Sequence, residues 1–357
     1  MSLPQLAREI SQALQRGQVI PAHPLALNEN RKLDERRQRA LTRYYLDAGS
    51  GGIAVGVHST QFEIRKPDVG LFQPVLELAK DEIDDYVSKT KKPIVRIAGI
   101  VGQTKQALAE AKLASDLRYH AGLLSLTAFP GATNQTLLKH CRAVSEIIPL
   151  FGFYLQTAMG GRELDIDFWR EFAQIENVVA VKIAPFDRYQ TFDTVRGVVE
   201  SGRSDEIALY TGNDDNIVMD LITDYSIPVE SRLVKKRIVG GLLGHWAVWT
   251  KSAVDLLKRI QTSLDRDGNI PLEFLTVGAQ VTDCNAAFFD AANNFAGSFV
   301  GIHEVLRRQG LLEGVWTLNP NDRLSLQQRN EIDRVYKAYP ELNDDAFVAD
   351  HLDKWLG

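Results

Sequence analysis

The stretch NVVAVKIAPFD, residues 177–187, decides how the rest of the chain is interpreted. Its apolar run is short, rich in β-branched residues and closed by Pro185, which is typical of a strand buried in a parallel sheet. Lys182 lies inside this run. Because a buried ammonium group without a partner is costly, this lysine either reaches solvent or a carboxylate, or it has a chemical role.

Apolar runs of this kind alternate with helix-like segments along the first 261 residues. The predicted strands are 18–27, 52–57, 93–99, 122–128, 150–157, 178–184, 206–212 and 238–244. Helical patterns lie between them, for example at 33–49, 103–122, 134–148 and 165–176. Strands that are each followed by a helix predict an α/β fold, a (β/α)8 TIM barrel with an N-terminal helix, over residues 1–261. Residues 262–357 show no further strand pattern and are predicted to form a C-terminal helical region.

Composition and charge exclude several classes of protein. The 357 residues are 45% hydrophobic and 24% charged, with a net charge of −5, and the basic clusters at 31–39 and 232–237 are short or interleaved with acids. Nucleic acid is therefore not an expected partner. The two cysteines, Cys141 and Cys284, have no metal-ligand spacing. No run of about 18 apolar residues predicts a membrane span, and the N-terminus lacks a signal peptide's apolar core, so a cytoplasmic location is expected.

The predicted barrel places Lys182 near the carboxyl end of strand six, where barrel enzymes carry their chemistry. Its neighbours on the same face, Ala180 and Ala184, are small and leave room for a ligand. Desolvation there would lower the pKa of Lys182 and favour the neutral amine, which attacks carbonyl carbons. Tyr154 lies on the preceding strand, where its hydroxyl is expected to move protons for imine formation; the alternative is a core tyrosine.

Three features together carry a family resemblance. Tyr154, Lys182 in VKIA, and the turn GVHST at 56–60 resemble the dihydrodipicolinate synthase and N-acetylneuraminate lyase family of class I Schiff-base aldolases, from about residue 17 to 260. The resemblance implies a barrel with C-terminal helices that forms a homo-oligomer, usually a homotetramer. It also implies that Lys182 forms an imine with pyruvate or another 2-oxo acid, without a separate cofactor. Tyr154 then carries protons, and Ser59 and Thr60 hold the keto acid's carboxylate.

The chain also departs from that family. Phe129 and Pro130 stand where dihydrodipicolinate synthases have a tyrosine pair, so the proton relay is either lost or supplied by another group. Met159 occupies the position of the arginine that grips aspartate semialdehyde, and Arg162 is the nearest arginine. Lysine biosynthesis is therefore not expected.

Further substrate contacts are expected after the predicted strand seven and on the predicted strand eight. Asn213 and Asp214 in GNDD resemble the family's acidic turn after strand seven and are candidates for binding a second substrate. The alternative for Asp214 is a cap on the next helix. Gly241, on the predicted strand eight, is a further candidate for substrate binding.

Three histidines are specific to this chain. His23, His58 and His245 fall at the carboxyl ends of predicted strands one, two and eight, which are consecutive around a closed barrel. They could bind substrate, act as acid or base near neutral pH, or ligate a divalent metal. The alternative for each is a structural role at a strand end or against aromatic residues. We expect them to serve the substrate and not a metal, because an imine already activates the carbonyl.

Three functions remain open at the level of sequence. The first is a lyase that acts on a small-molecule 2-oxo acid through a Schiff base on Lys182, by aldol cleavage, by addition to an aldehyde, or by dehydration. The second is a metal-assisted barrel lyase that uses the histidines. The third is a barrel that binds a keto acid or sugar acid without turning it over, because fold does not fix function.

Overall fold

The computed structural model describes residues 3–266 and 268–357. Eight parallel strands with helices between them form a (β/α)8 barrel, which C-terminal helices follow, so the predicted fold class is confirmed. The chain divides into two compact units. One comprises Val95–Leu242 with the N-terminal segment up to Gln18, and the other comprises Val19–Ile94 and Leu243–Gly357.

The first unit contains most of the parallel strands. Its strands are β3 (Val95–Ile100), β4 (Ala121–Leu124), β5 (Leu150–Leu155), β6 (Val178–Ala184), β7 (Ala208–Thr211), β8 (Asp224–Val229) and β9 (Arg232–Leu243). Its helices are α1 (Arg8–Arg16), α4 (Thr104–Asp116), α5 (Asn134–Ser145), α6 (Ile166–Ala173), α7 (Arg188–Glu200) and α8 (Ile217–Ile222). Strands β3 to β7 pair in parallel in chain order, and β9 follows β7.

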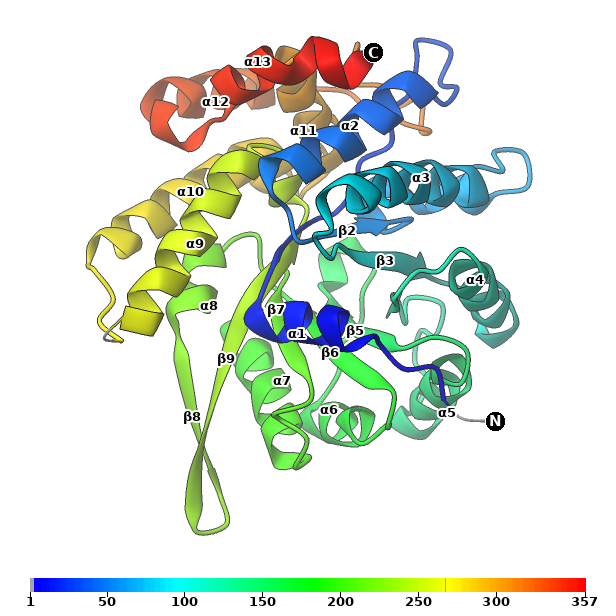
Figure 1. The fold of residues 1–357 in the computed structure, drawn as a ribbon, viewed down its shortest axis with the longest axis vertical. Coiled ribbons are helices and arrows are strands. Elements are labelled where there is room, and N and C mark those ends of the chain that lie inside the picture. The colour runs from blue at the N-terminus through cyan, green and yellow to red at the C-terminus, as the bar shows by residue number, and fades with distance from the viewer. Residues whose placement is uncertain (1–2, 267) are drawn as a thin grey trace. The chain divides into compact units, whose positions relative to one another are not determined.

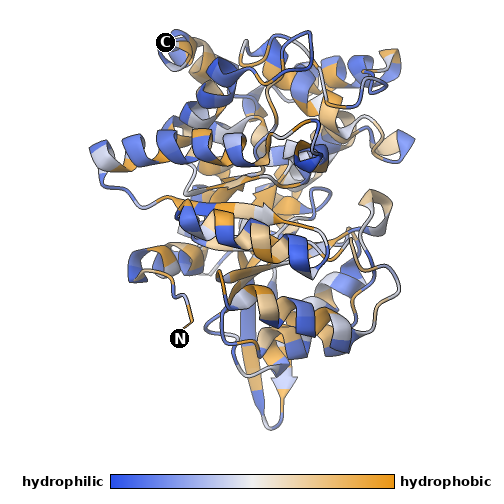
Figure 2. Ribbon diagram, turned by 90° about the vertical axis from the view of Figure 1, so that its right-hand side faces the viewer, coloured by the Kyte–Doolittle hydropathy of each residue, from blue (hydrophilic) through white to orange (hydrophobic). Residues whose placement is uncertain are grey.

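Local sequence explains how these elements begin. Asp165 and Asp187 precede α6 and α7, and each side chain accepts a hydrogen bond from a backbone N–H in the first helical turn, at 2.8 Å. Such caps satisfy amide groups that have no partner within the helix. Apart from the hairpin of β8 and β9, the strands are mostly apolar, as Figure 2 shows, whereas the helices mix polar and apolar residues. Apolar strands covered by amphipathic helices are the pattern of a parallel barrel.

A hairpin between β8 and β9 differs from the sequence-based expectation. Only 238–244 was predicted as a strand, and 232–237 was interpreted as a basic cluster. In the structure β9 begins at Arg232 and pairs antiparallel with β8, with Asp224 opposite Arg237. Their side chains form an ion pair at 3.2 Å. The hairpin extends beyond β7 (Figure 1), and this cross-strand ion pair stabilises its base.

The second unit contains two barrel strands and the C-terminal helices. Its strands are β1 (Val19–Pro21) and β2 (Gly52–Val55). Its helices are α2 (Glu35–Ala48), α3 (Phe72–Thr90), α9 (Thr250–Arg266), α10 (Glu273–Phe289), α11 (Ser298–Arg308), α12 (Leu326–Ala338) and α13 (Asp345–Leu356). Within the described residues after 262 there is no strand, as predicted. The predicted domain boundary at 261/262 stays a prediction, and α9 runs across it.

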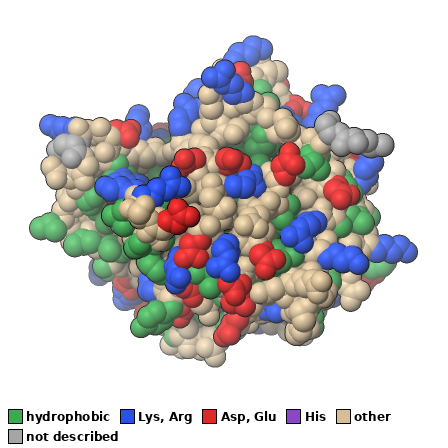
Figure 3. All heavy atoms as spheres, turned by 90° about the horizontal axis from the view of Figure 1, so that it is seen from below, with side chains coloured by type: hydrophobic (Ala, Val, Ile, Leu, Met, Phe, Trp, Pro, Cys, Tyr) green, Lys and Arg blue, Asp and Glu red, His purple; other side chains and the backbone are tan. Residues whose placement is uncertain are grey.

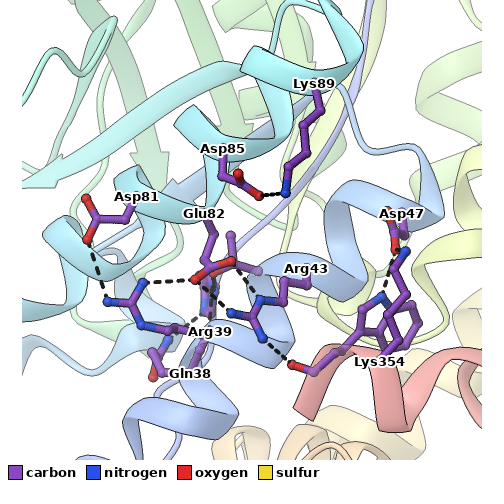
Figure 4. A network of polar contacts seen from close by, with 12 residues as sticks. Gln38, Arg39, Arg43, Asp47, Asp81, Glu82, Asp85, Lys89 and Lys354 are labelled. Carbon is purple, nitrogen blue, oxygen red and sulfur yellow. Dashed lines mark hydrogen bonds and ion pairs between the residues drawn. The ribbon is translucent and has the colours of Figure 1, made fainter. Parts of the chain in front are cut away.

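A network of charges joins α2, α3 and α13 (Figure 4). Arg43 on α2 contacts Glu82 on α3 through two hydrogen bonds, of 2.7 and 3.2 Å, and donates a third to the carbonyl oxygen of Trp355, at 2.6 Å. Arg39 donates to the same carboxylate at 2.9 Å. Glu82 therefore accepts hydrogen bonds from two guanidinium groups of α2, and Arg43 links α2 and α3 to α13.

The surface fits the expectation from composition. On the face shown in Figure 3, Lys and Arg side chains are interspersed with Asp and Glu, so no broad positive patch lies there. Among the residues that the structure describes, no helix is both long enough and apolar enough to cross a membrane.

Candidate functional site

Lys182 lies near the carboxyl end of β6, with a side chain that is only 8% exposed. On β5 its neighbour in the register is Phe153, and its neighbour on β7 is Tyr210. The Nζ atom lies 4.6 Å from the centroid of the Phe153 ring, so the ammonium group rests on an aromatic face. The lysine is therefore buried, as the sequence indicated, but it lies against the aromatic ring of Phe153, which the sequence did not indicate.

Burial lowers the pKa of Lys182 from 10.5 to about 8, and the negative charge of Asp214 partly opposes this shift by raising it. Asp214 follows β7 and is itself buried. The lysine side chain runs past Gly212, where a Cβ atom would lie 2.5 Å from Lys182 Cε. A glycine is therefore needed at position 212 for the Lys182 side chain to take this path. Asp214, whose negative charge acts on the ammonium group, follows two residues later.

Tyr154 does not lie on the face of Lys182. It pairs with Ile183 in the register, and its ring packs against Trp169 of α6, with centroids 5.5 Å apart. Its hydroxyl accepts a hydrogen bond from the backbone N–H of Leu164 at 3.1 Å. Burial raises the pKa of this hydroxyl to about 12. The expectation that the Tyr154 hydroxyl lies beside Lys182 is wrong, and the alternative of a core tyrosine describes its surroundings.

A bulge in β6 causes this difference. Leu150 pairs with Val178, but the next residue, Phe151, pairs with Ala180, so Val179 has no partner on β5. Without the bulge, Tyr154 would face Lys182. Because side chains alternate along a strand, a shift of one residue reverses the face of every residue that follows.

Asn213 holds the backbone around the site and has no free side-chain group. Its Oδ1 accepts from the backbone N–H of Phe186 at 2.9 Å. Its Nδ2 donates to Asp220 at 2.9 Å and to Thr191 at 3.2 Å. The predicted contact between Asn213 and substrate is therefore not supported by its hydrogen bonds. Its bond to Phe186 fixes a backbone position with φ of 55°, directly after β6.

The structure bears differently on the predictions for Asp214 and for Gly241. Asp214 is not the cap of α8, since Asn216 occupies that position and makes no side-chain cap bond. The alternative weighed for Asp214 from sequence is therefore wrong. The backbone N–H of Gly241 donates to the carbonyl oxygen of Gln18 at 3.1 Å, so that amide is part of the sheet. A role for Gly241 in binding substrate stays a prediction.

Ser59 and Thr60 are the last two residues of a short 3₁₀ turn, His58–Thr60, which follows β2 in the second unit. The Ser59 hydroxyl donates to the carbonyl oxygen of Ala22 at 2.8 Å, and the Thr60 hydroxyl donates to that of His23 at 2.7 Å. These bonds tie the turn to the end of β1. Their predicted role in holding a carboxylate stays a prediction, and it would require each hydroxyl to give up its carbonyl partner.

His23 is structural in its contacts. Its Nδ1 lies 2.8 Å from the carbonyl oxygen of Pro24, and its Nε2 lies 2.9 Å from the hydroxyl of Thr42 on α2. Its ring packs edge-on against Tyr45. Burial lowers the pKa of His23 to about 4, although the Pro24 bond raises it. Both ring nitrogens are thus occupied by the fold, which does not support the predicted contact with substrate.

The other two histidines have different neighbours. His58 lies between Phe62 and Phe299 of α11, with ring centroids 5.6 and 4.8 Å away. His245 stacks on Phe288 of α10 at 5.5 Å, and burial lowers its pKa to about 4. Each of the three histidines therefore packs on a different aromatic residue, as the structural alternative expects, and the convergence of the three imidazoles stays a prediction. Across residues 3–266 and 268–357, no three His, Cys, Asp or Glu side chains group as metal ligands.

Arg162 is also committed to the fold. Its guanidinium donates to the carbonyl oxygens of Phe129 at 2.7 Å and of Ala132 at 2.9 Å. It therefore braces the loop after β4 instead of presenting a free cation. The Phe129 ring packs on His140, with centroids 4.6 Å apart.

Comparisons with solved structures identify the fold. No family model and no curated protein matches the chain. Dihydrodipicolinate synthase from Oceanobacillus iheyensis matches 93% of this chain and 99% of its own, with a TM-score of 0.72 and 17% identity. The chain has the dihydrodipicolinate synthase fold. N-acetylneuraminate lyase from Fusobacterium nucleatum matches 91% of this chain and 99% of its own, with a TM-score of 0.68 and 15% identity. The predicted resemblance is confirmed at the level of the fold.

The sequence patterns did not indicate two residues that lie beside Lys182 in this dihydrodipicolinate synthase fold, Phe153 and Gly212. Phe153 was passed over because the β6 bulge cannot be read from an apolar run. Gly212 was quoted within GNDD, but only its neighbours were singled out. A glycine directly after a barrel strand is a signal of close approach by another group, and it could have indicated the path of the lysine.

Proposed function

We propose that this protein is a lyase that forms a Schiff base between Lys182 and a small 2-oxo acid of the pyruvate type. The observation that carries the proposal is the buried Lys182 on the carboxyl half of β6, with its pKa lowered to about 8. Near neutral pH such a lysine is partly the neutral amine, whereas an ordinary lysine is almost entirely charged.

The chemistry follows from the neutral amine. The Nζ atom attacks the keto carbon, a C–N bond forms, and the former carbonyl oxygen takes up protons and leaves as water. The resulting imine withdraws electrons, so that the neighbouring carbon can lose a proton and become an enamine. The enamine adds to an aldehyde, and the reverse step cleaves an aldol. These steps need a proton carrier near Nζ.

Asp214 is the proton carrier in this proposal, in place of Tyr154. Asp214 is buried, lies close after Gly212, which the lysine stem touches, and its charge acts on Lys182. Phe153, the β5 residue on the lysine's face, has no proton to give. A carboxylate beside an imine-forming lysine can accept the proton of the attacking amine and return it to the departing oxygen.

The substrate class rests on the neighbours and on charge. One similar structure, the Acinetobacter baumannii dihydrodipicolinate synthase, is described as complexed with pyruvate. Aspartate semialdehyde is not the second substrate of this proposal, because Met159 carries no charge and Arg162 is held by two carbonyl oxygens. The protein works as a homo-oligomer in this proposal; among the neighbours, one dihydrodipicolinate synthase variant is described as the first monomeric one.

A second candidate function is a barrel that binds a 2-oxo acid without turning it over. Phe153 beside Lys182 favours it, because a lysine can capture a keto acid even where proton transfer is too slow for turnover. The metal-assisted alternative has no such support, since no three His, Cys, Asp or Glu side chains of the described residues group as metal ligands.

Borohydride trapping tests the proposal. Intact mass after incubation with pyruvate and borohydride should rise by one reduced pyruvate unit, and peptide mapping should locate it on Lys182. Lys182→Ala should lose both the label and any lyase activity, because alanine cannot form an imine. Tyr154→Phe is the matched control and should keep the label, since that hydroxyl points to Leu164. Labelling that persists in Lys182→Ala would sink the proposal, and labelling without turnover of any aldol would favour the binding barrel.

A further inference from the structure

Helix α10, the turn that follows it and helix α12 line an oxygen-rich cavity far along the chain from Lys182. The cavity has a volume of about 230 Å³, and its lining includes Asp283, Asp290, Gln328, Glu331 and Arg334. All of these residues belong to the second unit. Three carboxylates and one guanidinium give the lining an excess of negative charge.

The Gln328 side chain lies at the centre of this region and is only 1% exposed. Its Nε2 donates to the carbonyl oxygens of Gly297, Phe288 and Ala287, at 3.0, 3.2 and 3.4 Å. Those bonds fix which end of the amide is nitrogen, because only the nitrogen can donate to three carbonyls. Among the residues that the structure describes, the buried Oε1 atom has no hydrogen-bond donor.

That amide oxygen lies near a carboxylate oxygen of Asp290. A Cβ atom on Gly297 would lie 2.3 Å from Gln328 Oε1 and 2.8 Å from Asp290 Oδ2, so the two oxygens are near each other. The other carboxylate oxygen, Asp290 Oδ1, already accepts from Asn293 Nδ2 at 2.7 Å. The Gln328 amide oxygen is thus a buried acceptor without a donor beside a carboxylate oxygen, and a positive charge that contacts both oxygens would remove the cost of burying it.

Arg334 does not supply this charge. Its guanidinium is held by Asp283 at 2.7 and 2.8 Å and by Glu331 at 2.9 Å. Asp290 is therefore left without a cationic side chain among its described partners. We propose that a hard cation binds between Asp290 Oδ2 and Gln328 Oε1, with oxygen ligands only. Carboxylate and amide oxygens are ligands of Ca²⁺ and of alkali cations, and not of the softer transition metals.

A cation at this position would stabilise the turn that leads into α11. Gly297 is the residue before α11, and Phe299, in the first turn of α11, packs on the His58 ring. A cation that joins the end of α10 to Gln328 of α12 fixes this turn. It thereby fixes the aromatic surface against which His58 lies, next to Ser59. The inference does not rest on the proposed function, since it concerns binding and stability alone.

Thermal unfolding in defined salts tests the site. The full-length protein is treated with a chelator, dialysed into choline chloride, and then titrated with CaCl₂, KCl or NaCl in parallel. The unfolding midpoint should rise by several degrees with one of these cations, in a saturable way, because a ligand of the folded state stabilises it by mass action. Calorimetric titration at 25 °C should show one site per chain for the same cation.

Asp290→Asn should abolish both signals, because it removes the charge and keeps the shape. Glu331→Gln is the matched control from the same cavity and should keep them, since Arg334 retains Asp283. If no cation shifts the midpoint or gives binding heat, a water molecule between the two oxygens explains the geometry and the proposal is wrong. An equal cation response in Asp290→Asn would overturn it as well.

Discussion

The identity of the side chain beside Lys182 depends on one unpaired residue. With Val179 as a bulge, Phe153 faces the lysine and Tyr154 faces Trp169. The ammonium group thus meets an aromatic ring at 4.6 Å instead of a hydroxyl. Proton transfer must then come from another strand, and Asp214 after β7 is the group whose charge acts on Lys182.

The substitution Asp214→Asn tests two roles of this carboxylate separately: its effect on the pKa of Lys182 and its proposed role in proton transfer. Its charge raises the pKa of Lys182, so its removal should move the inflection of imine formation from about 8 to lower pH. A more neutral amine alone would make trapping faster at pH 7. If Asp214 also carries the proton, the rate at the high-pH plateau should fall by about 10²-fold or more.

The measurement is the rate of borohydride trapping between pH 6 and 10. Asp215→Asn, in the same turn, is the control, and its plateau should stay close to that of the unchanged protein. A plateau in Asp214→Asn equal to that of the unchanged protein would leave Asp214 with an electrostatic role only.

At the scale of elements, the charge network of Figure 4 shows how polar contacts hold α2, α3 and α13 in the second unit. Glu82 on α3 is the shared partner of Arg39 and Arg43. The side chain of Glu82 is only 10% exposed, whereas Asp85, one turn later on α3, is 56% exposed in its pair with Lys89. Ion pairs on one helix thus range from nearly buried to solvated.

Glu82→Gln should lower the free energy of unfolding by about 1–3 kcal/mol, because two guanidinium groups lose their charged partner in a partly dry environment. Asp85→Asn should change it by less than about 0.5 kcal/mol, since an exposed pair contributes little. Urea unfolding with both variants measures the difference. Equal effects of the two substitutions would show that burial does not govern this network.

At the scale of the whole molecule, several histidines are buried in the neutral form. Burial lowers the pKa of His23, His245 and His303 from 6.5 to about 4. These histidines therefore become protonated below pH 6.5 in the unfolded chain, but only near pH 4 in the folded chain. The stability that these histidines contribute is complete above pH 6.5 and is lost as the pH falls from 6.5 towards 4.

Acid unfolding should be correspondingly steep. His303 lies on α11 outside every candidate site, and it contributes on the order of 3 kcal/mol to the loss between pH 6.5 and 4. His303→Gln should reduce the slope of unfolding free energy against pH in that window, whereas Leu272→Gln at an exposed position should keep it. Urea titrations at half-unit pH steps provide the slopes. An unchanged slope in His303→Gln would contradict neutral burial.

Much of the architecture was determined by local sequence. Short β-branched runs and the helical patterns between them predict barrel strands, and β6 matches its predicted range, 178–184. The burial of Lys182 near the end of that strand also follows from its apolar neighbours. The long apolar and amphipathic segments after residue 262 predict the C-terminal helices. These features depend on residues close in the chain, so periodicity is enough to find them.

Only the tertiary structure decided which side chains meet. The bulge at Val179 set the partner of Lys182, since register depends on how two separate strands pair. Likewise, His23 is occupied by α2, Asn213 by Phe186 and Asp220, and the Ser59 hydroxyl by the end of β1. Each of these polar groups looks free in sequence, because its partners lie between 7 and 37 residues away and are brought to it only by packing of the folded chain.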